Sequence, residues 1–438
     1  MLLNAADKAL WRLALPMIFS NITVPLLGLV DTAVIGHLDS PVYLGGVAVG
    51  ATATSFLFML LLFLRMSTTG LTAQAWGAKD PQRLARALVQ PLALALGAGV
   101  LIILLRLPLI DLALHIVGGS EAVLEQARRF LDIRWLSAPA SLANLVLLGW
   151  LLGVQYARAP VILLVVGNLL NIVLDLWLVM GLRMNVQGAA LATVTAEYAT
   201  LIIGLLMAKR VLTLRGVSLA MLKNAWRGDL RRLLALNRDI MLRSLLLQLC
   251  FGALTVFGAR LGSDIVAVNA VLMTMLTFTA YALDGFAYAV EAHSGQAYGA
   301  RDGSQLLEVW RAAGRQSGMV ALAFALIYSL AGQYIIALLT SLPSLQQLAD
   351  RYLIWQTILP VVGVWCYLLD GMFIGATRGA EMRNSMAVAA AGFAVTLLTL
   401  PVLGNHGLWL ALAVFLALRG LSLALIWRRH WRRGTWFS

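Results

Sequence analysis

The chain has 438 residues, of which 12% are charged, where a soluble globular domain carries about 25%. Apolar types make up 61% of the residues, the mean hydropathy is +0.85, and apolar runs continue from one end to the other. This composition excludes a soluble protein and a soluble domain with one membrane anchor. A net charge of +13 would suggest nucleic acid in a soluble protein. In a membrane protein, an excess of positive charge instead indicates how the chain is oriented across the membrane. No nucleic-acid partner is expected.

Twelve apolar runs have the length of about twenty residues that a transmembrane helix needs. They are continuous and do not alternate every second residue, so they predict helices and not barrel strands. The expected fold class is an all-α integral membrane protein with twelve transmembrane helices. In chain order the runs are 13–36, 43–74, 84–105, 130–154, 160–182, 187–208, 240–261, 265–290, 308–338, 350–376, 384–403 and 407–427.

Most of the 33 lysines and arginines fall in alternate loops, on the side that holds both termini. Cytoplasmic loops are enriched in these residues, so we expect a multi-pass protein of the bacterial inner (plasma) membrane with both termini in the cytoplasm. The largest basic clusters lie at 209–238 and 428–433, where anionic membrane lipids are expected partners.

An internal repeat divides the chain into two halves. The segment QAWGAKD at 74–80 returns as QAYGARD at 296–302, and the same offset in residue number relates two GxxxG motifs that begin at Gly149 and Gly371. Six runs in each half predict two six-helix bundles that cross the membrane in the same direction, related by an axis along the membrane normal. The predicted domains are 1–208, a basic cytoplasmic linker at 209–239, and 240–438 with a basic tail. Paired bundles permit alternating access.

Carboxyl groups inside the runs are the first candidates for function, because burying them is costly unless they are protonated, paired or hydrated. Asp31 lies in the first run, and Asn171 and Asp175 lie four residues apart on one helix face in the fifth. Two carboxyls in one apolar cavity favour protonation of at least one, as proton coupling requires. At the repeat offset, Asp31 corresponds to Ala253 and Asp175 to Leu397, so the pair belongs to the first half only.

The second half offers Asp284 and Asp370 as candidates for a substrate cleft, where Asp370 could attract a cationic substrate; a structural role explains each equally well. Glu291 lies near the cytoplasmic end of its run and is expected to be solvated or to lie at the end of a helix. For Arg243 and Arg419 we expect snorkelling or a structural ion pair.

The sequence contains no motif for nucleotide binding or hydrolysis, neither GxxxxGK[ST] nor HExxH. Cys250 and Cys366 lie inside apolar runs, and the five histidines are scattered, so no metal site is expected. We therefore expect a protein that is not an enzyme and has no cofactor, driven by an ion gradient.

The chain contains the motifs VDTAVIGHL (30–38), NIVLD (171–175), QGAALAT (187–193), NRDIMLRS (237–244), GATRG (375–379) and the repeated QA[WY]GA[KR]D. In this order they resemble the motifs of the multidrug and toxic compound extrusion (MATE) family, and of its DinF branch in particular. The resemblance implies a twelve-helix, two-lobe antiporter that exports amphiphilic, often cationic, small molecules in exchange for protons or sodium. It also implies a first-lobe cation site in which protonation of Asp31 is coupled to bending of the first helix. That site would consist of Asp31, Asn171, Asp175 and Thr193.

Three alternatives to a proton-coupled exporter remain. A sodium-coupled exporter of the same fold is the nearest, although the lack of an acidic residue between Ile240 and Gly258 favours protons. A lipid-linked oligosaccharide flippase would need several cations to hold a pyrophosphate, whereas the cleft candidates are acidic. A membrane enzyme would need clustered catalytic residues that the sequence lacks. The expected partners are small amphiphilic or cationic substrates and membrane lipids, and the expected state is a monomer.

Overall fold

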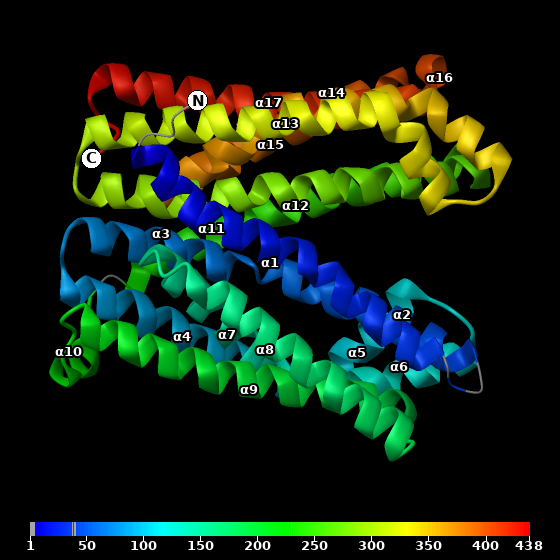
Figure 1. The fold of residues 1–438 in the computed structure, drawn as a ribbon, viewed down its shortest axis with the longest axis horizontal. Helices are drawn as coiled ribbons and strands as arrows, with labels where there is room; N and C mark the ends of the chain where they lie inside the picture. Colours follow the sequence, from blue (N-terminus) through cyan, green and yellow to red (C-terminus); the bar gives the residue numbers. More distant parts are fainter. Residues whose placement is uncertain (1–4, 37, 39–40, 229) are drawn as a thin grey trace. The chain divides into compact units, whose positions relative to one another are not determined.

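The computed structural model describes residues 5–36, 38, 41–228 and 230–438, with the backbone only for residues 23–33. Within this part the chain is helical and contains no strand (Figure 1). The first half holds α1 (Ala5–Gly36), α2 (Pro41–Leu60), α3 (Phe63–Gly77), α4 (Pro81–Leu104), α5 (Arg106–Val117), α6 (Glu121–Arg134), α7 (Ala138–Gly153), α8 (Arg158–Asp175), α9 (Asn185–Leu214) and α10 (Leu219–Asn224). The second half holds α11 (Leu230–Arg260), α12 (Ser263–Gly299), α13 (Gly303–Leu339), α14 (Pro343–Gly375), α15 (Gly379–Thr396), α16 (Leu400–Leu403) and α17 (Asn405–Arg433).

Eleven helical stretches among the described residues are long and apolar enough to cross a membrane. They correspond to the second to twelfth predicted runs, and α1, with 32 residues, covers the first. Some stretches consist of two consecutive helices: α2 and α3 form Pro41–Gly77, and α6 and α7 form Glu121–Gly153. The prediction of an all-α membrane protein is confirmed. Its outer surface is apolar, as Leu330 and Val402 illustrate with 81% and 86% exposure.

The chain divides into two compact units, which we call the N-terminal unit (residues 22–233) and the C-terminal unit (residues 1–21 and 234–438). The division falls inside α1 and inside α11. The predicted boundaries therefore differ from this division at the start of the chain, because residues 1–21 group with the second half. The predicted linker at 209–239 is largely helical, since it holds the end of α9, all of α10 and the start of α11.

The first turns of α1 join the C-terminal unit through a buried acidic residue. Asp7 is 1% exposed; its carboxylate accepts a hydrogen bond from Gln316 Nε2 at 3.0 Å and lies 3.3 Å from Arg315 Nη1. Further along α1, the ring of Trp11 packs edge-on against Phe286 with centroids 5.2 Å apart. All of these partners belong to the opposite half of the sequence, so no local pattern predicts the contacts.

The internal repeat extends to equivalent packing contacts in the two units. A Cβ added to Gly149 would lie 2.6 Å from the carbonyl oxygen of Arg65, and one added to Gly371 would lie 2.7 Å from that of Ala287. The repeat offset relates Gly149 to Gly371, and it also relates Arg65 to Ala287. The GxxxG motifs thus let α7 approach α3 closely in one unit and α14 approach α12 in the other, as small residues do in membrane bundles.

Candidate functional site

The polar side chains predicted in the first half lie on the buried face of α8. Asn171 and Asp175 are 2% and 1% exposed, whereas Leu169 and Val173, on the opposite face of the same helix, are 58% and 61% exposed. The four-residue spacing puts the amide and the carboxyl one turn apart. The helix therefore turns its apolar side outward and its polar side toward the protein, which is the arrangement expected for functional groups inside a membrane.

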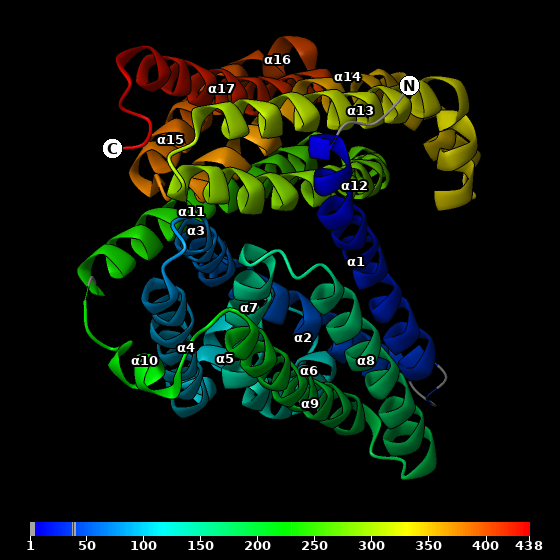
Figure 2. The ribbon, with the colours of Figure 1, turned by 60° about the vertical axis from the view of Figure 1, so that its left-hand side comes forward.

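A change of helix geometry follows this site directly. Asp175 is the last α-helical residue of α8, and residues Leu176–Gly181 continue as a π-helix. Its wider ladder is visible where the amide of Leu182 donates to the carbonyl of Trp177, five residues earlier, at 2.9 Å. Short π segments are rare and occur often at functional sites. The segment turns the chain from α8 toward α9, which lies beside α8 (Figures 1 and 2).

Helix α9 supplies the third predicted group. Thr193 Oγ1 accepts a hydrogen bond from Asn171 Nδ2 at 3.5 Å and donates to the carbonyl of Ala189 at 3.2 Å. Asn171 Oδ1 is buried and has no hydrogen-bond partner in the described part of the chain, so it is an acceptor that faces away from solvent and is ready for a proton donor or a cation. Asn171 and Thr193 therefore meet across α8 and α9, and Asp175 lies one turn from Asn171 on the same buried face of α8. These three residues are here called the α8–α9 site. Asp31 lies within α1, and its side chain falls outside the described residues.

Asp370 in α14 stands between two arginines. Its Oδ2 accepts a hydrogen bond from Arg243 Nη2 of α11 at 2.7 Å and another from Arg419 Nη2 of α17. The three residues are 4–7% exposed. The ion-pair alternative for Arg243 and Arg419 is thus confirmed. A carboxylate that already neutralises one of two guanidinium groups is poorly suited to attract a cationic substrate. These two contacts therefore argue against the role in a substrate cleft that the sequence predicts for Asp370.

The remaining acidic candidates of the second half lie on α12. Asp284 is half-buried and close enough to Tyr281 and Tyr367 for its charge to act on both hydroxyl groups. Glu291 is 2% exposed and lies within α12, which continues to Gly299, so the expectation that it is solvated or at a helix end is wrong. The reason is the close approach of α14: a Cβ on Gly375 would lie 2.9 Å from the Glu291 carbonyl oxygen.

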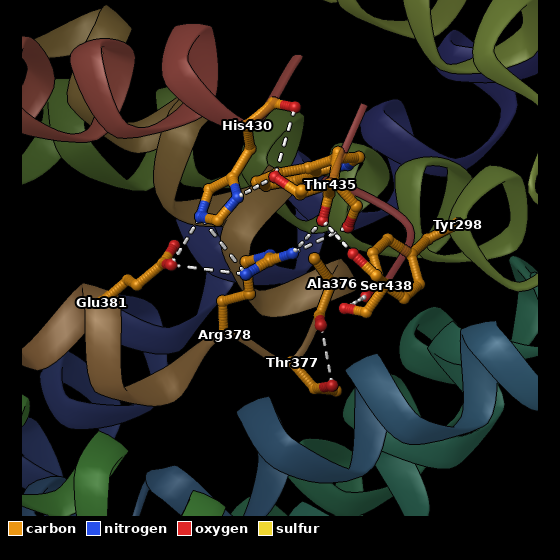
Figure 3. Close-up of polar contacts among 9 residues, drawn as sticks. Tyr298, Ala376, Thr377, Arg378, Glu381, His430, Thr435 and Ser438 are labelled. Atoms are coloured by element: carbon orange, nitrogen blue, oxygen red, sulfur yellow. Dashed lines mark hydrogen bonds and ion pairs between the residues drawn. The ribbon is translucent and has the colours of Figure 1, made fainter. Parts of the chain in front are cut away.

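The sequence analysis missed a polar network at the end of α17 (Figure 3). Arg378 donates through Nη2 to the carbonyls of Thr435 and Trp436, each at 2.9 Å. His430 Nε2 lies 2.7 Å from Glu381 Oε1, and its Nδ1 lies 2.7 Å from Thr435 Oγ1. Arg378 belongs to the GATRG motif, so its role in this structure is to hold the segment that follows α17. The scattered spacing of the histidines gave no sign that His430 takes part.

Comparisons with known proteins agree with this architecture. The sequence profile of the MatE family matches twice, over residues 16–177 and 240–403, one match in each half of the repeat. The chain is 87% identical over 436 residues to DNA damage-inducible protein F of Escherichia coli strain K12, and the match covers 100% of this chain and 95% of that protein. It is 23% identical over 431 residues to probable multidrug resistance protein NorM of Acinetobacter baylyi, covering 96% and 94% of the two chains.

Among solved structures, a crystal structure of MATE in the bent conformation matches with a TM-score of 0.85 at 23% identity, and the match covers 98% of this chain and 96% of that one. At 23% identity, this structural similarity is evidence for the fold alone. The two profile matches cover most of the sequence, and the relative from Escherichia coli is similar over the full length. The chain therefore belongs to the MatE family.

Proposed function

We propose that the protein is a secondary antiporter that exports amphiphilic small molecules across the bacterial inner membrane in exchange for protons. Membership of the MatE family supports transport as the activity, and a relative with the name multidrug resistance protein supports small amphiphilic molecules as substrates. The protein would act as a monomer, without a cofactor and without catalysing a chemical reaction. The observation that carries proton coupling is the buried carboxyl of Asp175 in the α8–α9 site.

The chemistry of the α8–α9 site suits a proton that is loaded on one side and released on the other. A carboxyl group in apolar surroundings is costly to ionise, so it keeps a proton until water or a cation reaches it. Asn171, one helix turn from Asp175 on α8, and Thr193, on the neighbouring helix α9, provide hydrogen-bonding groups. Such groups can orient the carboxyl in both protonation states. Asp31, on α1, is the second carboxyl that we propose for this site.

Coupling follows if the outward-open and inward-open states differ in their affinity for the proton. A ligand can shift an equilibrium only by its differential affinity for the two states. Protonation of the α8–α9 site on the acidic side would favour the state that releases substrate, and loss of the proton on the other side would favour the state that binds it. Substrate export then uses the inward flow of protons.

The test is transport in proteoliposomes with a pH gradient or a sodium gradient imposed separately. We expect efflux of a fluorescent amphiphile to follow the pH gradient and to fall at least tenfold in the variants Asp31→Asn and Asp175→Asn. The matched control is Asp132→Asn, an aspartate of α6 whose side chain is 47% exposed and pairs with Arg106. Efflux that follows sodium only, with both aspartate variants active, would establish the sodium-coupled alternative.

We further propose that the termini lie in the cytoplasm and that the end of α17 contacts anionic lipid. Leu421 and Leu425 on α17 are each 56% exposed, and the arginines that follow surround a hollow of about 300 Å³. A helix face that changes from apolar to basic within one turn matches the boundary between acyl chains and head groups. The lining residues of the hollow are Leu425, Arg428, Arg429, Arg432 and Arg433.

The orientation can be tested by labelling, because Cys250 and Cys366 are both buried. In spheroplasts, a membrane-impermeant maleimide should label Ala122→Cys, in the exposed first turn of α6, without treatment. It should label Ser438→Cys only after the membrane is permeabilised. Immediate labelling of Ser438→Cys would place the C-terminus outside.

A further inference from the structure

The C-terminal unit buries two guanidinium groups with a single carboxylate between them. Arg243, Asp370 and Arg419 come from three helices, α11, α14 and α17, and are 6%, 7% and 4% exposed. Both arginines donate to the same atom, Asp370 Oδ2. We call these residues the arginine pair and its counter-ion. At the repeat offset they correspond to Asn21, Leu148 and Glu197, so the arrangement exists in one half only.

The charges and hydrogen bonds of this cluster do not balance. Arginine keeps its charge in proteins, so two arginines and one aspartate carry a net charge of +1. Within the described residues neither arginine has an ion pair with any acid other than Asp370. Arg243 Nε and Arg419 Nε are also buried and lack a hydrogen-bond acceptor among those residues. The three residues thus carry one positive charge and have two Nε–H donors to spare, in a region that water does not readily reach. Asp284 on α12 is the next acid whose charge reaches Cys366 beside them.

A purely structural pair would not need this surplus. One arginine and one aspartate form a neutral pair, whereas a second buried arginine adds a desolvation cost that the single carboxylate does not offset. The surroundings are also partly apolar: the ring centroid of Phe415 lies 5.6 Å from the Arg419 guanidinium carbon, and a Cβ on Gly420, the next residue, would lie 3.4 Å from the backbone nitrogen of Cys366. Such a site suits a group with one negative charge attached to an apolar body.

We infer that Arg243 and Arg419 bind the anionic head group, a carboxylate or a sulfonate, of an amphiphilic substrate. The planar guanidinium fork presents paired N–H donors that match two oxygens of such a group, and the unused Nε atoms complete that geometry. Asp370 holds the two arginines together when the site is empty, and in the occupied site it limits the net charge to zero. This inference names the substrate class of the proposed exporter and rests on that proposed function for its role in transport.

The experiment measures binding without any gradient, so that it does not depend on proton coupling. The full chain in nanodiscs of zwitterionic lipid is titrated with two fluorescent probes that share a dansylaminoundecyl body, one ending in a carboxylate and one in a trimethylammonium group. We expect the carboxylate probe to bind at least tenfold more tightly. Arg243→Gln and Arg419→Gln should each weaken its binding about tenfold or more, because each removes a charged bidentate donor. Arg260→Gln, at the exposed end of α11, should leave it unchanged.

The variant Asp370→Asn separates a binding role from a structural role. Removal of the counter-ion raises the net charge to +2, so the carboxylate probe should bind at least as tightly as to the natural chain and the ammonium probe more weakly. A structural role predicts weaker binding of both probes in Asp370→Asn, together with a lower melting temperature, and this result would overturn the inference. Arg419→Lys keeps the charge but not the fork, and should retain part of the affinity even if a glutamine variant does not fold.

A further arm distinguishes an amphiphile from an inorganic anion. Binding of the carboxylate probe is repeated in millimolar sodium chloride and in the same buffer without it. We expect little change, because chloride lacks the apolar body. Equal affinity of the two probes, or displacement of the carboxylate probe by millimolar chloride, would overturn the inference. Tight carboxylate binding without pH-driven efflux would reject the proposed proton coupling and leave this site standing.

Discussion

Lys79 and Arg301, which occupy equivalent positions in the two halves of the repeat, hold the same left-handed backbone conformation, with φ of 55° and 52°. Each follows the end of a helix. The amide of the next residue, Asp80 or Asp302, returns to a carbonyl five residues earlier at 3.2 and 3.0 Å, which closes the helix end. The same aspartates then cap the following helices, α4 and α13. The repeated QA[WY]GA[KR]D segment is therefore a turn between two helices, built twice in the same way.

The left-handed backbone at Lys79 and Arg301 predicts that glycine is favourable at these two turn positions, although glycine in the interior of a helix is destabilising. A residue with a Cβ in the left-handed region costs roughly 1–2 kcal/mol, and glycine does not. Lys79→Gly and Arg301→Gly should each leave the melting temperature of the detergent-solubilised protein unchanged or higher, and Lys79→Val should lower it. Lys209→Gly, in the interior of α9, is the control and should destabilise by about 1 kcal/mol. Equal destabilisation by glycine at 79 and at 209 would contradict the assignment.

The close helix approach at the GxxxG motifs gives a second prediction. An alanine at Gly149 or Gly371 would bring its Cβ within 2.7 Å of a backbone carbonyl that cannot move away easily. We expect each alanine variant to lose about 1–3 kcal/mol of stability, as overpacked sites do. Gly252→Ala on α11 is the matched control, because a Cβ there meets nothing within 4 Å. Thermal unfolding measures the stability of the three variants. If Gly252→Ala loses as much stability as the other two, close packing is not the cause.

The buried start of α1 gives a third prediction. Asp7→Asn removes the ion pair with Arg315 and keeps a side chain that can still accept from Gln316. Because the Arg315 side chain is 40% exposed, the loss should be modest, about 1 kcal/mol. Thermal unfolding measures it, and Asp264→Asn, in the exposed first turn of α12, is the control. No difference between the two variants would show that Asp7 does not anchor the helix.

These residues also show which parts of the structure could be predicted from the sequence and which could not. The membrane helices and the buried face of α8 were predictable, because apolar runs of sufficient length and a spacing of four residues are local properties. The place of Asp7 was not, since its partners lie 308 and 309 residues away. The arginines around Asp370 were not predictable either, because they lie 127 and 49 residues away in the sequence. Their charges meet only when three helices pack together, so the sequence alone could not assign a partner to Asp370.

The hydrogen bond between α8 and α9 gives the last prediction, which separates Thr193 from its neighbour Thr195. Thr193→Val keeps the shape of the side chain and removes the oxygen that accepts from Asn171 Nδ2. The buried amide of Asn171 then lacks that acceptor, at a cost of about 1–3 kcal/mol, and the site loses its hydrogen bond between α8 and α9. Among the residues that the structure describes, Thr195 Oγ1 bonds only to the carbonyl of Leu191 in its own helix, at 2.9 Å, and Thr195 is exposed. In proteoliposomes with a pH gradient, Thr193→Val should export a fluorescent amphiphile about tenfold more slowly, and Thr195→Val at the natural rate. If both variants transport alike at equal melting temperature, the α8–α9 hydrogen bond has no part in coupling.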